Sequence, residues 1–476
     1  MITCFRKTEA KYFSREALTE FLVKRNDLPS KPALSEAHLR LDRRPLRCVL
    51  SQLIRLPTMS DDTKCPGDLA TAPGRNSLIS ERRILFWMSV LVGVNQLGFG
   101  AMVPSLPLYA SSFGVSASAI GLAVAAYGLA RFVAVLPGGQ LADRWGRRPV
   151  LATGGLISAI GSFWCAEAHS FIEFNLARIV AGAGAGIILT IGQIILADIS
   201  SPDRRGRNIA TYQAAFLFGF GVGPFPGGLL ASAYGLAAPF LMTGVASLLS
   251  TAIAWFMVSE TRSARPGAVA SGKAKEIPFV RQMLGLLSHR GFLLVSLISL
   301  MNAVVRTGGL FALIPLLATT ALGLSVAEIG FAMMVSGVCG FAAAYPAGWL
   351  ADRIGRKAVI VPSTLLTGLS MVLFCYAPSY AWFMAASIVW SVSASIGSSA
   401  PAAYVVDTAP AGMNASAMTA YRMTADAGYV VGPPGLGLLA DLTSPTVAII
   451  SASVVLVAVG AIFAVTSEKR TMPLRG

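Results

Sequence analysis

The segment Gly138-Gly-Gln-Leu-Ala-Asp-Arg-Trp-Gly-Arg-Arg148 lies between two long apolar stretches and occurs twice in the chain. The second copy is Ala347-Gly-Trp-Leu-Ala-Asp-Arg-Ile-Gly-Arg-Lys357, and its Asp lies 209 positions after the Asp of the first copy. The same offset relates four further matches: Ile120-Gly121 with Ile329-Gly330, Pro137 with Pro346, Asp198 with Asp407, and Gly223-Pro224 with Gly432-Pro433. A constant offset over more than a hundred residues indicates an internal duplication.

The composition is typical of a membrane protein. Of the 476 residues, 54% are hydrophobic and 13% are charged, and the mean hydropathy is +0.65. Apolar stretches of about 20 residues, the length of helix that crosses a hydrocarbon core of about 30 Å, alternate with short charged segments. These stretches are too long and too continuous for barrel strands, so helices must satisfy their backbone groups. The sequence therefore predicts an all-α polytopic membrane protein.

The net charge of +15 invites comparison with nucleic-acid-binding proteins, but the distribution of Lys and Arg indicates a membrane topology instead. Basic residues are concentrated before residue 84 and in alternate loops between the spans, whereas the other loops contain none. This asymmetry follows the positive-inside rule. We expect a multi-pass protein of the cell inner (plasma) membrane with both termini in the cytoplasm, a lipid bilayer around it and no nucleic-acid partner.

Cysteine and histidine give no sign of a metal or redox site. The six Cys and three His residues are scattered, without the paired short spacings that such sites use. A nucleophile–base set and a phosphate-binding loop are not apparent either. We therefore expect no metal, no cofactor and no enzymatic activity, and among other classes of protein a non-transporting membrane sensor is the alternative.

The apolar stretches divide the chain into two bundles of six helices. We expect a polar cytoplasmic extension at residues 1–83, for which translation from Met59 is the simpler explanation, and bundles at 84–258 and 291–466. A cytoplasmic linker at 259–290 joins them, and a cytoplasmic tail follows at 467–476. The expected spans are about 84–108, 116–137, 150–166, 171–199, 209–231, 236–258, 291–318, 326–346, 358–377, 380–406, 415–439 and 447–465.

Each copy of the repeated basic segment is expected to be a loop with a gating role. Its glycines allow a tight turn, Asp143 can accept hydrogen bonds at a helix N-terminus, and Arg147 can pair with Asp198. Such contacts would latch two rocking halves at the cytoplasmic face, although a purely structural basic loop is the alternative. The candidate gating residues are Gly139, Asp143, Arg144, Gly146, Arg147 and Asp198, and in the second copy Gly348, Asp352, Arg353, Gly355, Arg356 and Asp407.

These segments resemble the loop signature Gly-x-Leu-Ala-Asp-Arg-x-Gly-Arg-Lys of the major facilitator superfamily. Residues 139–148 and 348–357 match it, with Arg148 in place of the final Lys. The resemblance covers about residues 84–466. It implies two six-helix bundles around a central cavity, which works by alternating access.

The fifth span contains Gly219-Phe-Gly-Val-Gly-Pro-Phe-Pro-Gly-Gly228. Gly and Pro at this density allow close helix packing and bending, and packing alone is one interpretation. The string also resembles the antiporter signature of the superfamily, and residues 97–107 resemble the first-helix signature of its twelve-helix drug:proton antiporters. This resemblance implies export rather than uptake, through a helix that seals the cavity against proton leak; its candidate residues are Gly219, Gly223, Pro224, Gly227 and Gly228.

Four arginines and one deep acid lie inside the spans: Arg131, Arg178, Arg306, Arg422 and Asp426. Each Arg costs about 2.5 to 3.5 kcal/mol at mid-bilayer on insertion scales, so these side chains should face a cavity or a partner, unless Arg131 snorkels to the surface. Arg178 matches the fourth-helix Arg that the family resemblance implicates in proton transfer. Asp426 follows Arg422 by four residues on the same helix face, either to exchange a proton or to form a static ion pair.

The leading hypothesis is a monomeric, proton-coupled exporter of small amphiphilic compounds, a multidrug-type antiporter. Proton coupling is assigned to Asp426, Arg178 and Arg422. The candidate cavity residues are Asn95, Gln96, Gln193, Asn302, Arg306 and Trp390. Carriage of an organic anion or another metabolite is the alternative, because four Arg against one Asp leave the interior positive.

Overall fold

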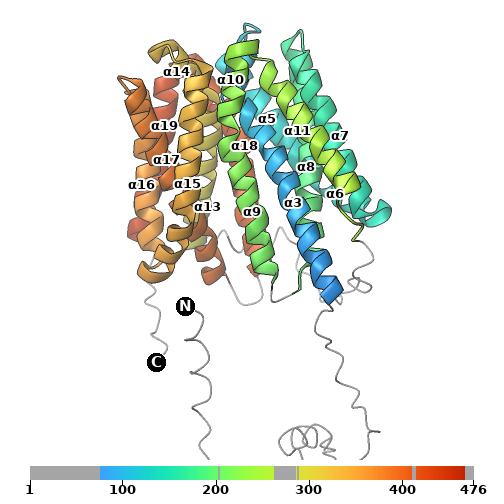
Figure 1. Cartoon of the computed structure of the whole chain (residues 1–476). Coiled ribbons are helices and arrows are strands. Elements are labelled where there is room, and N and C mark those ends of the chain that lie inside the picture. Colours follow the sequence, from blue (N-terminus) through green and yellow to red (C-terminus); the bar gives the residue numbers. More distant parts are fainter. Residues whose placement is uncertain (1–74, 202–203, 262–285, 287–288, 410–413, 467–476) are drawn as a thin grey trace, which may run out of the picture. The chain divides into compact units, whose positions relative to one another are not determined.

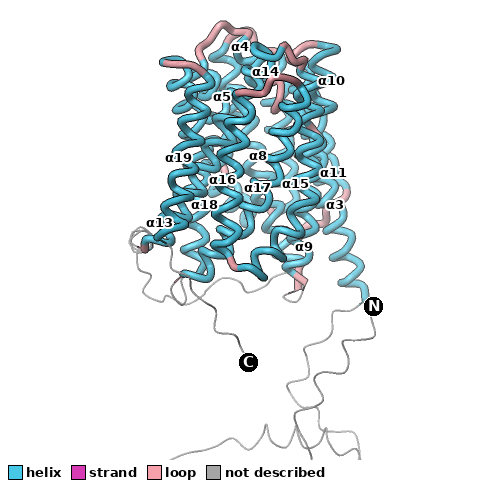
Figure 2. The backbone as a smooth tube through the Cα atoms, turned by 90° about the vertical axis from the view of Figure 1, so that its left-hand side faces the viewer, coloured by secondary structure: helices cyan, strands magenta, loops and turns pink. Residues whose placement is uncertain are grey.

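The computed structural model describes residues 75–201, 204–261, 286, 289–409 and 414–466. These residues form helices and loops, and these ranges contain no strand (Figure 2). The all-helical fold class is thereby confirmed. Residues 1–74 of the predicted N-terminal extension, most of the linker and the tail fall outside the described residues, and Met59 is among them. Residues 75–83, which were predicted to belong to the extension, form the start of the first helix.

The first half of the described chain contains nine helical segments, and eight of them make six spans (Figure 1). The short segment Leu106–Ser111 lies between the first and the second span. The second and fifth spans are each built from two consecutive segments, α5–α6 and α9–α10. The segments are α3 (Arg75–Met102), α4 (Leu106–Ser111), α5 (Ala117–Val133), α6 (Val135–Trp145), α7 (Arg147–Ala166), α8 (Phe171–Ile199), α9 (Arg205–Val222), α10 (Pro224–Tyr234) and α11 (Ala238–Phe256).

The second half repeats this pattern. Its seventh span, Arg290–Leu322, contains a wide π-helical turn between two α-helical parts. The segments are α13 (Arg290–Val304), η2 (Val305–Leu313), α14 (Ile314–Leu322), α15 (Val326–Ile354), α16 (Arg356–Cys375), α17 (Tyr380–Thr408), α18 (Asn414–Leu442) and α19 (Pro445–Thr466).

Within the described ranges, 11 helices are long and apolar enough to cross a membrane. Helix α18 is the remaining span: it has 29 residues but carries Arg422 and Asp426, which lower its hydropathy. The chain therefore has twelve transmembrane helices in two six-helix repeats.

Two of the helix breaks lie beside prolines, although other prolines lie inside continuous helices. Pro224 opens α10 directly after α9 ends, and Pro315 lies in the first turn of α14, directly after the π-helical turn. Proline lacks the amide hydrogen that an α-helix requires, which locally loosens the hydrogen-bond ladder. The π-helical turn holds Arg306 and belongs to the wall of the cavity described below.

The expectation that residues 138–148 form a loop is wrong for most of the segment. Helix α6 continues through Trp145, and the chain turns only at Gly146, whose φ of +99° favours glycine. The second copy behaves alike, because α15 runs to Ile354 and Gly355 has a φ of +93°. The helix can include these basic residues because they follow the apolar part of the span.

The two halves pack together through two equivalent helix pairs, α5 with α18 and α10 with α15. Glycines permit this approach: a side chain on Gly121 would collide with the backbone of Pro433, and one on Gly330 with that of Pro224. These two contacts are related by the 209-residue offset. The repeated segments 138–148 and 347–357 lie at one end of the bundle, which is called the basic end. The contacts of Gly121 and Gly330 lie toward the other end, which is called the opposite end.

Candidate functional site

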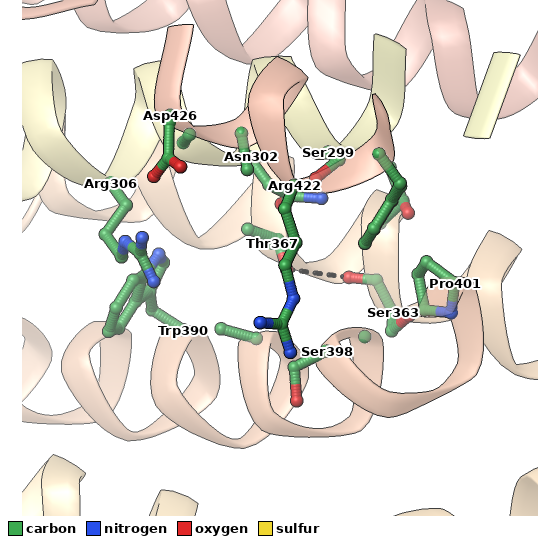
Figure 3. A pocket seen from close by; sticks show the side chains of 16 residues that line it. Ser299, Asn302, Arg306, Ser363, Thr367, Trp390, Ser398, Pro401, Arg422 and Asp426 are labelled. Atoms are coloured by element: carbon green, nitrogen blue, oxygen red, sulfur yellow. Dashed lines mark hydrogen bonds between the residues drawn. The ribbon is translucent and has the colours of Figure 1, made fainter. Parts of the chain in front are cut away.

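A cavity of about 410 Å³ lies within the second half of the molecule (Figure 3). Its wall combines hydroxyl, amide and charged groups with apolar surface and two aromatic rings. The lining residues come from α13, η2, α16, α17 and α18: Ser299, Asn302, Ala303, Arg306, Ser363, Thr364, Thr367, Trp390, Ala394, Gly397, Ser398, Pro401, Tyr421, Arg422, Ala425 and Asp426. This volume is in the range of small-molecule binding sites.

Charged groups lie on two sides of this cavity. Figure 3 shows Asp426 and Arg306 toward one side, while the guanidinium of Arg422 extends toward Ser398. Among the described residues, Asp426 has no ion-pair partner within 4.0 Å. The static pair of Arg422 with Asp426 is therefore not formed, because a shared helix face does not fix the direction in which a long side chain extends.

A cation of the first half packs against the helix that carries Asp426. The guanidinium carbon of Arg131 lies 5.0 Å from the centre of the Tyr429 ring, which joins α5 to α18. Tyr429 follows Asp426 by three residues, so the two lie on neighbouring turns of one face of α18. Arg131 therefore contacts the partner half instead of snorkelling. Tyr429 was not predicted from the sequence, because only helix packing identifies it as the residue that faces Gly128.

The candidate residues of the first half lie elsewhere. Arg178 is only 1% exposed; its guanidinium carbon lies 4.3 Å from the centre of the Tyr127 ring, and its Nε donates to the Ala123 carbonyl at 3.3 Å. Asn95 and Gln96 are buried in α3, and Gln193 is exposed. The cavity formed by the described residues includes none of these four, whereas Asn302, Arg306 and Trp390 do line it.

The repeated basic segments form ion pairs inside each half. In the first half, Arg147 Nη1 lies 2.5 Å from Asp143 Oδ1, and its Nε lies 3.2 Å from Asp198 Oδ2. In the second half, Arg356 Nε lies 3.3 Å from Asp407 Oδ2. These pairs join consecutive helices of one half, so a latch between the halves stays a prediction.

Other members of the repeated segments have separate surroundings. Arg353 stacks on the ring of Trp349 with 4.2 Å to its centre. Gly139 has open space where a Cβ would stand, and Arg144 interacts with another group of the protein. The side chain of Asp352 and the surroundings of Gly348 lie outside the described part of the molecule.

Glu260 contacts the first basic segment and was not predicted from the sequence. Its carboxylate accepts hydrogen bonds from the backbone amides of Arg147 and Arg148, at 2.9 Å and 3.1 Å. It thereby caps the N-terminus of α7, where a negative charge is favourable. The positive φ of Gly146 presents these amides, and the distance of more than a hundred residues in sequence explains why no local pattern indicated the contact.

The glycines of the fifth span serve two interfaces. Gly219, Gly223 and Gly227, spaced by four residues, pack against the backbone of α3 within the first half. Gly228 faces Val326 of α15 in the second half. Small residues at four-residue spacing let two helix backbones approach closely. Packing thus accounts for the first three glycines, while Gly228 lies where the halves meet.

Twelve spans in two repeats and a polar cavity between membrane helices define the architecture of a membrane carrier. Residues 88–317 and 295–475 match the family described as Major Facilitator Superfamily, and the chain belongs to this family. It is a transporter by family and a multi-pass membrane protein.

Two relatives cover different shares of the chain. An uncharacterized transporter of this type from Methanocaldococcus jannaschii is 23% identical over 363 residues, which is 75% of this chain and 91% of that protein. The quinolone resistance protein NorA of Staphylococcus aureus is 27% identical over 207 residues, or 44% of this chain and 51% of NorA. The chain thus matches about half the length of NorA.

Solved structures show the same fold. The nucleoside transporter NupG has a TM-score of 0.68 and 15% identity, with 81% of this chain and all of that chain covered (100%). The human organic anion transporter MFSD10 (TETRAN) has a TM-score of 0.57 and 18% identity, with 80% and 99% covered. At these identities the likeness concerns the fold alone.

Proposed function

We propose that this protein is a proton-coupled exporter that moves small amphiphilic compounds across the plasma membrane by alternating access. The observation that carries the proposal is the position of Asp426. This acidic residue belongs to a membrane helix, and its side chain lines the polar part of the cavity wall. Ionisable residues at this depth are costly and mark ion or substrate pathways. The similarity to NorA and the glycine-rich fifth span support export.

The surroundings of Asp426 supply a physical basis for coupling. Arg131 belongs to the first half, whereas Arg306 and Arg422 belong to the same half as the acid. A rocking movement between the halves changes the distance from Arg131 to Asp426 and leaves the other two in place. The charge around the acid therefore differs between the two states, which is the requirement for taking up a proton on one side and releasing it on the other.

Substrate contacts are proposed for the cavity wall. The rings of Trp390 and Tyr421 can pack against the apolar body of a ligand, and their polar atoms can donate hydrogen bonds to it. Asn302 and the hydroxyl groups of α16 add donors and acceptors. A cationic group on the ligand would compete with the proton for Asp426, so that binding of one expels the other.

The membrane location and orientation belong to the same proposal. Because basic residues concentrate in alternate loops, we place the basic end in the cytoplasm, with both termini there. The opposite end then faces outward. A monomer suffices, since the cavity is formed within one chain.

Internal pH in energised inverted vesicles tests the proposal. Addition of a cationic amphiphile should release protons from vesicles that contain the wild-type protein, and Asp426→Asn should abolish the release. Glu167→Gln is the matched control, because Glu167 is an exposed acid in a loop at the opposite end. Equal proton release by the wild type and Asp426→Asn would refute the role of Asp426.

A second candidate function is carriage of an organic anion. Two arginines against one acid line the cavity, so its wall is positive overall. In the same vesicles, this function predicts accumulation of a labelled organic anion and no proton release with cations. Arg306→Gln and Arg422→Gln would then lose accumulation, whereas Asp426→Asn would retain it.

A further inference from the structure

Two hydrogen-bonded contacts join the halves at the opposite end, and the internal repeat relates them. In one, the amides of Ala117 and Ser118 at the start of α5 donate to the carboxylate of Asp441 at the end of α18, at 2.8 Å and 2.9 Å. In the other, the amide of Ala327 at the start of α15 donates to the hydroxyl of Ser232 at the end of α10, at 3.2 Å. The offset of 209 residues maps Ser118 onto Ala327 and Ser232 onto Asp441.

The backbones around these contacts are equivalent as well. A Cβ on Gly437 of α18 would stand 2.7 Å from the Cα of Ser118, and one on Gly228 of α10 would stand 3.0 Å from the Cα of Ala327. Gly437 and Gly228 are again 209 positions apart. The same close helix crossing is therefore built twice, and the capping group is where the two copies differ in charge.

The source of negative charge at each helix start also differs. Helix α15 carries its own acid, because Glu328 in its first turn accepts a hydrogen bond from the amide of Ser325 at 2.8 Å. Helix α5, which is described over its full length, has no acid in its first turn. The N-terminus of α5 carries a partial positive charge, which attracts anions. Asp441 of the other half supplies the negative charge there.

We propose that Asp441 is an electrostatic latch that closes the opposite end of the transporter, and that the closing force is concentrated at the crossing of α5 with α18. Separation of the halves at this end removes the carboxylate of Asp441 from the N-terminus of α5. The N-terminus of α15 keeps Glu328, because this acid belongs to α15 itself. The inference rests on the alternating-access movement proposed above.

The size of the effect follows from the exposed position of Asp441. An exposed carboxylate at a helix N-terminus changes an equilibrium by about two- to fivefold. The loss of Asp441 should therefore raise the ratio of open to closed molecules at this end about two- to fivefold. Loss of the neutral cap at Ser232 should change it less.

The repeat itself supplies a sharp variant. Ala119 of α5 occupies the position that Glu328 occupies in α15. Ala119→Glu gives α5 an acid of its own, which duplicates the function of Asp441 and repels it. We expect this variant to open the end although every residue of the native contact is still present.

Distances between spin labels at the opposite end provide the test. The labels replace His169 and Tyr376, exposed residues of the first and second half, in full-length protein whose native cysteines have been replaced. The protein is reconstituted in liposomes without substrate or pH gradient. Asp441→Ser and Ala119→Glu should increase the long-distance population, and Ser232→Ala should stay close to the parent.

A steric control separates the latch from the movement on which it rests. Gly228→Val places atoms against the backbone of Val326 and forces this end apart without altering a charge. If Gly228→Val lengthens the distance while Asp441→Ser and Ala119→Glu do not, the latch is refuted and the movement stands. If no variant, Gly228→Val included, changes the distance, both the latch and the proposed movement are overturned.

Discussion

Replacement of Gly223 by Ala tests how closely the fifth span must approach the first. A Cβ at this position would stand 2.9 Å from the Ala101 amide nitrogen and 3.0 Å from the Gly100 Cα, and still closer to the Leu97 carbonyl oxygen. All three atoms belong to the backbone of α3, so no side-chain rotation can relieve the overlap. The helices must separate instead, which loosens the neighbouring contacts of Gly219 and Gly227.

The magnitude follows from known costs of overpacking. Extra atoms in a well-packed interior destabilise a protein by about 1 to 3 kcal/mol. The helices belong to one unit of about 400 residues. With an unfolding entropy of about 2.1 cal/mol/K per residue, each 1 kcal/mol lowers the Tm of such a unit by about 1.2 °C. Gly223→Ala should therefore lower the Tm by about 1 to 4 °C.

Thermal unfolding of the purified protein in detergent, followed by tryptophan fluorescence, measures this shift. Gly206→Ala is the matched control, because Gly206 lies in α9 and has open space where the Cβ would stand. Alanine favours the helix there, so the Tm of this control should stay constant or rise. An unchanged Tm for Gly223→Ala, or an equal decrease in both variants, would refute the packing argument.

Two further predictions concern the ends of the bundle. Gly146→Ala should lower the Tm more than Gly114→Ala. Both glycines have a positive φ, which costs about 1 to 2 kcal/mol for alanine. Of these two positions, only Gly146 would place the Cβ against a side chain, that of Glu260 at 2.6 Å. Equal decreases would show that Glu260 moves aside freely. Burial acts to raise the pKa of Asp441, but hydrogen bonds from Ser118, Ala117 and Ser116 outweigh it and hold the pKa below its ordinary range. Asp441 should thus stabilise the closed state of the opposite end fully above the ordinary carboxyl pKa of about 4, and this stabilisation should be lost as the pH falls through the lowered pKa of Asp441. Spin-label distances should show this loss in the parent protein and lack it in Asp441→Asn.

Much of the fold could be predicted because it follows from local properties of the chain. The fourth span was expected at 171–199, and helix α8 has these bounds. Span length and apolarity are one-dimensional, so they can be counted along the sequence. Prediction failed where a helix continues into a polar segment: α6 extends to Trp145, since polar residues permit a helix as well as a loop.

The candidate site was predicted less completely. Asn302, Arg306 and Trp390 line the cavity as expected, but the residues proposed from the first half do not. Arg178 is surrounded by Tyr127 and backbone groups within its own half. A polar residue inside a span must be satisfied, and the sequence does not show whether a cavity or a neighbouring helix satisfies it.

The membrane class, the duplication and the twelve spans follow from the amino-acid sequence alone, because hydrophobic length and repeat spacing can be counted along the chain. Which faces of the helices meet depends on their packing in three dimensions. This packing brings Asp441 to the start of α5 across 324 positions of sequence and stacks Arg131 on Tyr429. These contacts depend on the rotation and crossing of whole helices, and packing between distant segments sets both.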